Sequence, residues 1–137
     1  MNFILISSEI IFLVYLFLIG LIVGSFLNTL IYRLPLITGL VDRTDKFKKF
    51  NLLFPKSHCD NCSFLIPFYH NIPVFSFIFL RGKCYECGSN ISISYPVVEV
   101  LTGLVFFWFA KHIEPSYELS FFYFLTCSLI VIAFIDL

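Results

Sequence analysis

Apolar residues along this chain gather in three long runs, which are separated by one polar stretch and one short turn. The first run, Ile10–Tyr32, contains 23 residues and no charge, and Glu9 and Arg33 bound it. A helix that crosses a bilayer needs about 20 predominantly apolar residues, so this run predicts a transmembrane helix. A cleaved signal peptide would have Lys or Arg before a shorter run, and Met1–Glu9 contains neither. We therefore expect a retained helix.

The other two runs predict a helical hairpin. Pro96–Ala110 is short for a membrane span and contains Glu99, so it needs its flanks, or local tilt and thinning of the bilayer, to cross. Leu119–Ile135 has 17 residues and ends at Asp136. The segment between these runs, KHIEPSYE, is long enough only for a turn. The pattern therefore predicts an all-α polytopic membrane protein with about three transmembrane helices.

The composition supports a membrane protein, and the charges predict its orientation. Hydrophobic residues make up 59% of the chain and charged residues 13%, against about 45–50% and about 25% in soluble domains. Eight of the nine Lys and Arg residues lie between Arg33 and Pro96 together with four acidic residues, so this stretch has a net charge of +4. Lys and Arg are enriched in cytoplasmic loops, which is a simpler explanation than binding to nucleic acid. The basic stretch is therefore expected in the cytoplasm and the N-terminus on the periplasmic side.

Three regions follow from this pattern. Residues 1–32 hold the first transmembrane helix, residues 33–95 form a cytoplasmic basic loop, and residues 96–137 hold the second and third transmembrane helices. No nucleic-acid partner is expected, and the lipid bilayer is the first predicted partner.

The basic loop carries four cysteines with the spacing of a zinc site: Cys59, Cys62, Cys84 and Cys87. Each Cys-x2-Cys pair forms a tight knuckle, and two knuckles supply the four thiolates of a tetrahedral zinc site. The 21 residues between the pairs are one more than the longest common link of about 20. A bound metal would supply folding energy that a loop with a thin core lacks. We therefore predict a structural zinc in a small cytoplasmic cap.

Two disulfides and a redox-active Cys-x2-Cys pair are the alternatives to zinc. Disulfides need an oxidising compartment, whereas the charge distribution places this loop in a reducing one. A redox pair usually begins a helix of a thioredoxin-like fold, of which the sequence gives no sign. We expect His58 and His70 to be ordinary loop residues, because four cysteines already complete the site. Cys127, in the last run, is expected to be a small apolar packing residue.

The apolar link between the two cysteine pairs is FLIPFYHNIPVFSFIFL, which Pro67 and Pro73 interrupt. These prolines argue against a further spanning helix. We expect short strands in the link instead.

Polar residues inside the apolar runs mark helix contacts or a functional site. Gly20, Gly24 and Asn28 recur every four residues and therefore share one helix face. Small residues at this spacing let helices approach closely, and Asn28 is expected to hydrogen-bond a neighbour or to line a site. Glu99 and Asp136 lie within the membrane or at its edge, where ionisable residues are costly and usually functional. Each also has a structural explanation, Glu99 as an acid near a helix N-terminus and Asp136 as the first polar residue after a span.

Taken together, these motifs resemble the bacterial prepilin leader peptidases, the aspartic membrane peptidases of type IV pilus and type II secretion systems. The matching segments follow the family's order and approximate spacing and cover most of the chain from Gly20 onward. They are GSFLNTLIYRLP (24–35), CDNC (59–62), NIPVFSF (71–77), LRGKCYECG (80–88), ISISYPVVEVLTG (91–103) and FIDL (134–137). Asp60 departs from the family, in which the first knuckle often has proline at this position.

The resemblance implies a function, a location and a site residue. Members of the family cleave the positively charged leader from type IV prepilins and type II secretion pseudopilins, at the cytoplasmic face of the bacterial inner membrane. Many then methylate the new N-terminus with S-adenosylmethionine. Proteolysis in the family uses two aspartates, and Asp136 matches the first of them, so it is the expected catalytic residue. Prepilins or pseudopilins are the expected substrates.

The second aspartate of the family lies in a Gly-x-Gly-Asp motif, which this sequence does not contain. An aspartic protease holds a water between two carboxyl groups, one of which accepts a proton while the other donates one, so a single carboxylate cannot play both parts. We therefore expect a truncated or fragmentary family member that does not cleave prepilin alone. The alternative is a non-catalytic, membrane-anchored zinc module that binds prepilin or a secretion partner. A membrane thiol oxidoreductase is the third hypothesis.

Overall fold

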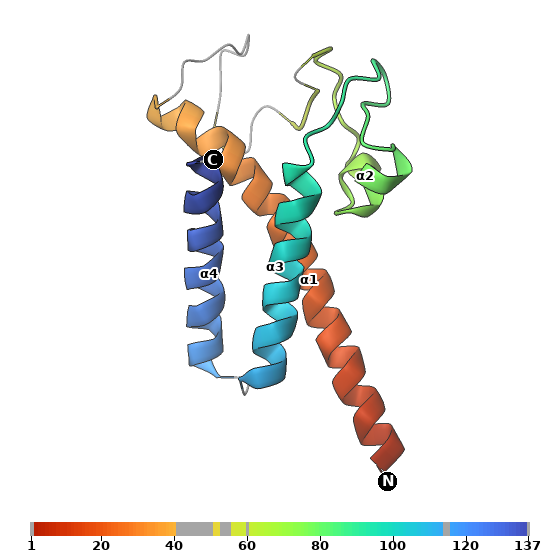
Figure 1. The fold of residues 1–137 in the computed structure, drawn as a ribbon, viewed down its shortest axis with the longest axis vertical. Coiled ribbons are helices and arrows are strands. Elements are labelled where there is room, and N and C mark those ends of the chain that lie inside the picture. The colour runs from red at the N-terminus through yellow and green to blue at the C-terminus, as the bar shows by residue number, and fades with distance from the viewer. Residues whose placement is uncertain (1, 41–50, 53–55, 60, 114–115, 137) are drawn as a thin grey trace.

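The computed structural model describes residues 2–136 except 41–50, 53–55, 60 and 114–115, and the regular elements of this part of the chain are all helices (Figure 1). The helices in chain order are α1 (Asn2–Thr38), the 3-10 helix η1 (Phe68–Asn71), α2 (Phe75–Phe79), α3 (Ser94–His112) and α4 (Tyr117–Ile135). Among the described residues, extended pairing is limited to two isolated bridges. The predicted all-α fold is therefore confirmed.

The long helix α1 crosses α3 at very close range because glycines line the crossing. A Cβ atom added to Gly24 would lie 2.7 Å from Glu99 Cα, and one added to Gly20 would lie 2.7 Å from Gly103 Cα. Real Cβ atoms do not approach a backbone this closely, so only glycine fits at these positions. The prediction that the small-residue face of the first helix packs on a neighbour is confirmed.

This crossing leads to a prediction about packing. We expect Gly24→Ile to force α1 away from α3 and to destabilise the folded protein by about 1–3 kcal/mol, the usual cost of overpacking a close contact. Ile22→Phe adds bulk two residues away on an exposed part of α1, since Ile22 is 63% exposed, and serves as the matched control. Thermal unfolding of both variants in the same detergent measures the difference. Equal midpoints for the two variants would contradict the close crossing.

The three long helices share one small core. Leu27 of α1, Val98 of α3, and Ile130 and Val131 of α4 are buried against one another. Cys127 is half-buried at this core, as predicted for an apolar packing residue. Farther along the hairpin, α3 and α4 are joined by a polar contact in which the Tyr123 hydroxyl donates to the Phe106 carbonyl over 3.0 Å, and the two rings stack with centroids 4.1 Å apart.

Two of the described helices are long and apolar enough to cross a membrane: α1 over Ser8–Thr38, and α4. Large apolar side chains on both are exposed in the isolated chain, for example Ile22 and Phe124. In water such a surface would be unfavourable, whereas in lipid it meets acyl chains. That α3 is the third span remains a prediction.

The helix α1 continues six residues beyond the uncharged run, through Arg33 and Pro35 to Thr38. It ends at Gly39, whose φ of +77° suits glycine, and the Leu40 amide donates back to the Pro35 carbonyl over 3.0 Å. This is the Schellman arrangement that commonly ends a helix. The predicted boundary between the first two regions, at residues 32 and 33, therefore lies inside α1, because one charged residue does not end a helix.

The prediction of short strands between the cysteine pairs is wrong. The link forms the helical turns η1 and α2 instead, and Pro67 is the N-cap of η1 with φ of −63°. Proline is pre-set for the start of a helical turn and cannot donate to a strand ladder, so the prolines favour turns here. The loops that carry the cysteines, together with η1 and α2, form a cap above and beside the upper end of α3 (Figure 1).

Candidate functional site

The four cysteines of the cap come together in one cluster. Their Sγ atoms all lie within 4.8 Å of one another, with Cys59 and Cys87 3.8 Å apart and Cys62 and Cys84 4.0 Å apart. A zinc ion with bonds of about 2.3 Å to four tetrahedral sulfurs would hold those sulfurs about 3.8 Å apart. The four cysteines are therefore positioned to bind a metal ion, and their donor set and spacing fit zinc.

The two knuckles have the same backbone hydrogen bonds. In each, the amide of the first cysteine donates to the carbonyl of the residue five positions later. The amide of the residue four positions later donates back to the carbonyl of that cysteine. The bonds are 2.8–3.0 Å long and join Cys59 with Phe64 and Ser63, and Cys84 with Ser89 and Gly88. The residue four positions after the first cysteine has a positive φ in both knuckles, 59° at Ser63 and 69° at Gly88. The same turn is therefore used twice, to aim both thiol pairs at one point.

The electrostatics of the cluster favour a cation. The Ser89 hydroxyl lies 3.1 Å from Cys87 Sγ and 3.5 Å from Cys59 Sγ, and it lowers the pKa of both thiols, that of Cys87 to about 6. The Phe64 amide lowers the pKa of Cys62, but burial and the neighbouring sulfurs outweigh it and raise that pKa to about 12. The negative charge of the first thiolates to form therefore keeps a neighbouring thiol protonated. A bound dication would offset the repulsion between the thiolates.

Neither histidine of the cap belongs to the cluster. His58 Nδ1 lies 3.0 Å from the Lys56 carbonyl oxygen. The His70 ring packs against Tyr69 and Tyr85, with centroids 4.7 Å and 5.3 Å away, and so connects η1 to the second knuckle. As predicted, neither is a ligand of the cysteine site, but both line the cavity described next, and His70 lies in η1 and not in a loop.

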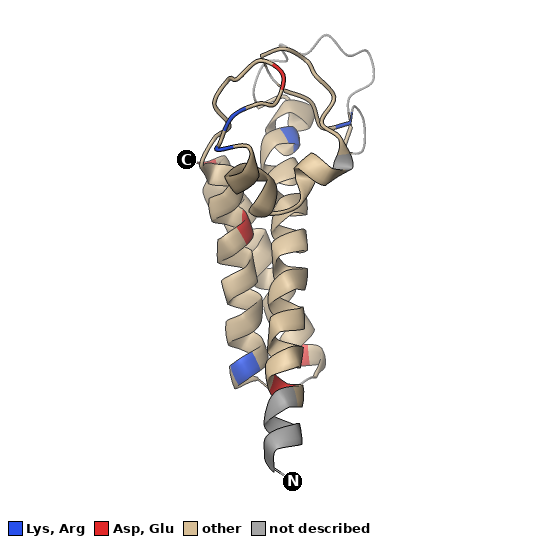
Figure 2. Cartoon of the chain, turned by 90° about the vertical axis from the view of Figure 1, so that its right-hand side faces the viewer, with Lys and Arg blue, Asp and Glu red and all other residues tan. Residues whose placement is uncertain are grey.

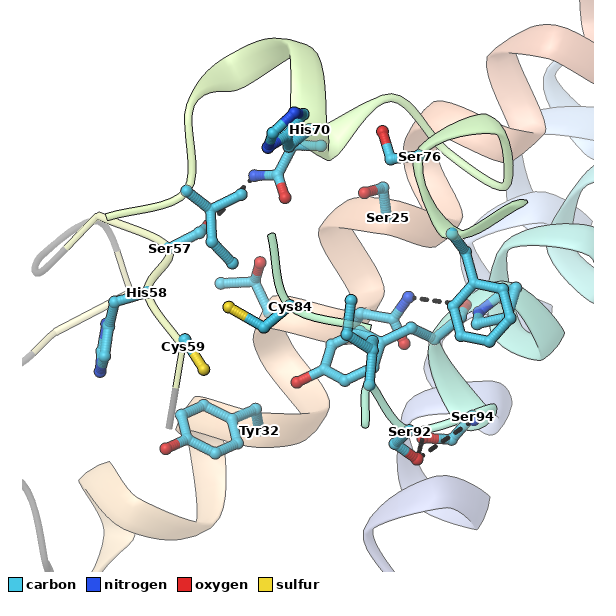
Figure 3. A pocket seen from close by; sticks show the side chains of 18 of the residues that line it. Ser25, Tyr32, Ser57, His58, Cys59, His70, Ser76, Cys84, Ser92 and Ser94 are labelled. Carbon is cyan, nitrogen blue, oxygen red and sulfur yellow. Dashed lines mark hydrogen bonds between the residues drawn. The ribbon is translucent and has the colours of Figure 1, made fainter. Parts of the chain in front are cut away.

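A cavity of about 850 Å³ lies between the cap, α1 and the first turns of α3 (Figure 3). Cys59 and Cys84 line one side of it, while Ser25 and Ser76 lie toward the other. The cysteine cluster therefore forms part of the wall of a pocket that reaches down to the long helices.

Asn28 and Glu99, the two polar residues predicted inside the membrane runs, both line this cavity. The Asn28 amide donates to the Tyr95 carbonyl over 3.0 Å and joins α1 to α3. The Glu99 carboxylate accepts the Val74 amide over 2.7 Å and is also hydrogen-bonded by Ser25. Both side chains are only 7% exposed, so these hydrogen bonds are largely shielded from water.

Glu99 holds a strained turn in place. Val74 has φ of 61° and ψ of −48°, and the Phe75 amide donates to the Pro73 carbonyl over 2.6 Å, which together form a γ-turn of the rare positive-φ kind. A β-branched residue in this region costs about 1–3 kcal/mol and persists only where its surroundings enforce it. The bond from Val74 to Glu99 is the contact that ties this turn, and with it α2, to α3.

This contact leads to a second prediction. We expect Glu99→Leu to speed hydrogen exchange at the Val74 amide by about 10- to 150-fold, because a hydrogen bond to a charged group contributes about 1.5–3 kcal/mol. Glu99→Gln keeps an oxygen that accepts the same amide, so it serves as the control and should change exchange much less. Exchange measured by NMR or mass spectrometry separates the two. Equal exchange rates in the two variants would refute the role of this bond.

Sequence reasoning missed the contribution of Arg33. Its side chain is 6% exposed, and Nη1 donates to the carbonyls of Asn51 and Leu52 over 2.9 Å and 3.2 Å. It therefore ties the end of α1 to the loop that leads into the cap. Its position as the first charged residue after a long apolar run was the one sequence feature that could have indicated this role. Its partners are too far along the sequence to be predicted.

Asp136 is separate from the cavity. It is the exposed C-cap of α4 and is absent from the cavity wall. The end of α4 that carries it lies at the same end of the helices as the cap (Figure 1). Three of the four acidic residues of the basic loop, Asp42, Asp45 and Asp60, lie outside the described residues.

Comparison with known proteins defines the class of this chain. The model of the family described as Bacterial Peptidase A24 N-terminal domain matches residues 18–113. The chain therefore belongs to this family, and the resemblance drawn from its motifs is confirmed. Together with the two apolar helices, this makes it a membrane protein.

Several curated relatives carry the name Prepilin leader peptidase/N-methyltransferase. The chain is 42% identical to that of Myxococcus xanthus (strain DK1622) over 92% of its own length and 34% of the relative's. It is 39% identical to that of Neisseria gonorrhoeae, over 86% and 46%, and 37% identical to that of Legionella pneumophila, over 88% and 46%. The chain thus spans between a third and a half of these relatives. No solved structure matches it.

Proposed function

We propose that this chain supplies the zinc-capped membrane module of a prepilin leader peptidase and N-methyltransferase. The observation that carries the proposal is the alignment of 92% of the chain with a relative of that name. The module would lie in the bacterial inner membrane with its N-terminus in the periplasm and the cysteine cap in the cytoplasm. This orientation follows from the basic charge between Arg33 and Pro96. In the part of the chain that the structure describes, Lys and Arg gather at the cap end with one exception (Figure 2).

Within this proposal, Asp136 provides one of the two carboxylates that hydrolyse the leader peptide. Asp136 ends α4 at the same end of the helices as the cap, so with the cap in the cytoplasm it would lie at the cytoplasmic membrane surface, where the leader would be cut. A carboxylate there takes a proton from the attacking water while a second, protonated carboxyl donates to the peptide carbonyl oxygen. Glu99 lines the cavity, from which Asp136 is separate, so it is not assigned this second role. The second carboxylate would come from the Gly-x-Gly-Asp motif of the family, supplied by another polypeptide segment.

We assign zinc a structural role. Held by Cys59, Cys62, Cys84 and Cys87, it would tie the two knuckles together and so fix the cap side of the cavity. All four ligand positions are protein thiolates, which is typical of closed structural sites and leaves none for substrate.

The cavity is the proposed site for the methyl donor, S-adenosylmethionine. Its volume of about 850 Å³ is within the range of small-molecule sites, about 300–1,000 Å³. The Glu99 carboxylate and the Asn28 amide in its wall would orient a cationic, polar ligand.

A chimera tests the proposed function. Residues 1–137 would replace the matching segment of the Neisseria gonorrhoeae relative, and the mass of a co-expressed prepilin would be measured. We expect the chimera to yield the shortened prepilin, because this segment supplies the same cap, helices and first aspartate. The relative without its matching segment is the control.

The second candidate, a module that binds prepilin without cutting it, is favoured by the separation of Asp136 from the cavity. It predicts that prepilin is retained by the chimera with its leader intact. That outcome would replace the peptidase proposal.

A further inference from the structure

The short helix α2 presents an apolar face that none of the described residues covers. Phe75, Ile78 and Phe79 are 63%, 66% and 91% exposed, and their spacing of three and four residues places them on one side of the helix. The other side faces inward: the Ser76 hydroxyl donates to the Tyr69 carbonyl, and the Phe77 ring packs against Gly82. Three large apolar groups on one and a half turns are therefore turned outward.

The depth of α2 along the helices suggests what this face meets. The bond from the Val74 amide to Glu99 fixes the start of α2 beside the second turn of α3. Glu99 in turn packs against Gly24 of α1, which lies eight residues before Tyr32, the last residue of the uncharged run. At 1.5 Å per residue, that contact is about 12 Å along α1 from the end of the run. The helix α2 thus begins level with the apolar part of α1 and α3.

The charges next to α2 fit a membrane surface. Arg81 and Lys83 follow the helix directly and are exposed. In Figure 1, α2 lies beside the upper end of α3, below the loops that carry the cysteines. A cluster of outward Phe and Ile side chains with Lys and Arg at its edge is the pattern of elements that lie in the interface of an anionic bilayer.

We propose that α2 is a lipid-binding element of the cap. Phe75, Ile78 and Phe79 insert at the boundary between head groups and acyl chains, and Arg81 and Lys83 contact anionic head groups. This element and the bond from Val74 to Glu99 together hold the cap onto the membrane helices, so the bilayer completes the outer support of the cavity. The proposal rests on the membrane placement of α1 and α3 and is independent of peptidase activity.

Tryptophan fluorescence tests the proposal, because Trp108 is the only tryptophan of the chain. The full chain is reconstituted in vesicles of phosphatidylcholine and phosphatidylglycerol whose acyl chains carry bromine, which quenches tryptophan on contact. Native Trp108, 55% exposed on α3, reports insertion of the long helices. In a Trp108→Phe background, Phe79→Trp reports on α2 and Tyr85→Trp, 69% exposed in the second knuckle, is the matched control.

We expect the emission of Phe79→Trp to be blue-shifted and quenched by the brominated lipid, and that of Tyr85→Trp to be neither. Ile78→Trp provides a second reporter on the same face, and zinc content verifies that each variant is folded. Replacing Arg81 and Lys83 by Gln, or omitting phosphatidylglycerol, is expected to reduce the quenching at Phe79→Trp.

The proposal is overturned if Trp108 is quenched while both α2 reporters behave like Tyr85→Trp, because the face then meets water. A blue shift of the α2 reporters without quenching also overturns it, since a protein surface or a second copy of the chain then covers the face. An unquenched Trp108 contradicts the membrane placement and overturns it as well. None of these readouts depends on prepilin cleavage.

Discussion

Cys84→Ser is expected to abolish stoichiometric metal binding and to unfold the cap. The wild-type chain should bind one zinc, because its four sulfurs already have nearly the separations that a tetrahedral ion requires. Changes in the second shell of a metal site alone cost about 10- to 100-fold in affinity, so loss of a direct ligand should cost more. Since the cap has few buried apolar residues, its folding free energy depends on the metal.

Metal analysis of the purified protein measures this effect. Cys127→Ser makes the same chemical change in α4, away from the cluster, and should keep one zinc per chain. Limited proteolysis should cut the cap of Cys84→Ser while sparing the helices. Equal zinc content in the two variants, or no stoichiometric zinc in the wild type, would show that the cluster is not a zinc site.

The features predicted correctly from the sequence are those that local patterns determine. Long apolar runs give helices in any context, and the glycine spacing on α1 defines a packing face by geometry alone. The paired Cys-x2-Cys motifs likewise specify two knuckles, which the structure brings together. Each of these features depends on residues within a few positions of one another, or on a chemistry with few alternatives.

The features that were missed depend on contacts between distant residues. The amide of Val74 meets Glu99 25 positions away, and Asn28 meets Tyr95 67 positions away. These contacts convert two isolated polar residues into the wall of one cavity, which no local pattern reveals. The link between the knuckles was misjudged for a related reason: its apolar, β-branched residues suit strands, but its prolines and the bond to Glu99 impose turns.

Asp136 is the residue on which the proposed chemistry depends most. It lies exposed at the cap end of α4. If it is one of two catalytic carboxylates, its replacement by the neutral, nearly isosteric Asn should slow cleavage by at least about 10²- to 10⁴-fold, the contribution of one acid–base group. A residue that only ends the helix would tolerate Asn, which suits a helix C-terminus at least as well because it carries no negative charge.

The rate at which the chimera shortens prepilin, compared between Asp136→Asn and Glu118→Gln, tests this account most directly. Glu118 is an exposed acid in the first turn of the same helix, at the opposite end from Asp136. The account predicts that Asp136→Asn abolishes leader cleavage while zinc content stays at one per chain, and that Glu118→Gln cleaves at the rate of the unaltered chimera. Cleavage by Asp136→Asn at that same rate would contradict it.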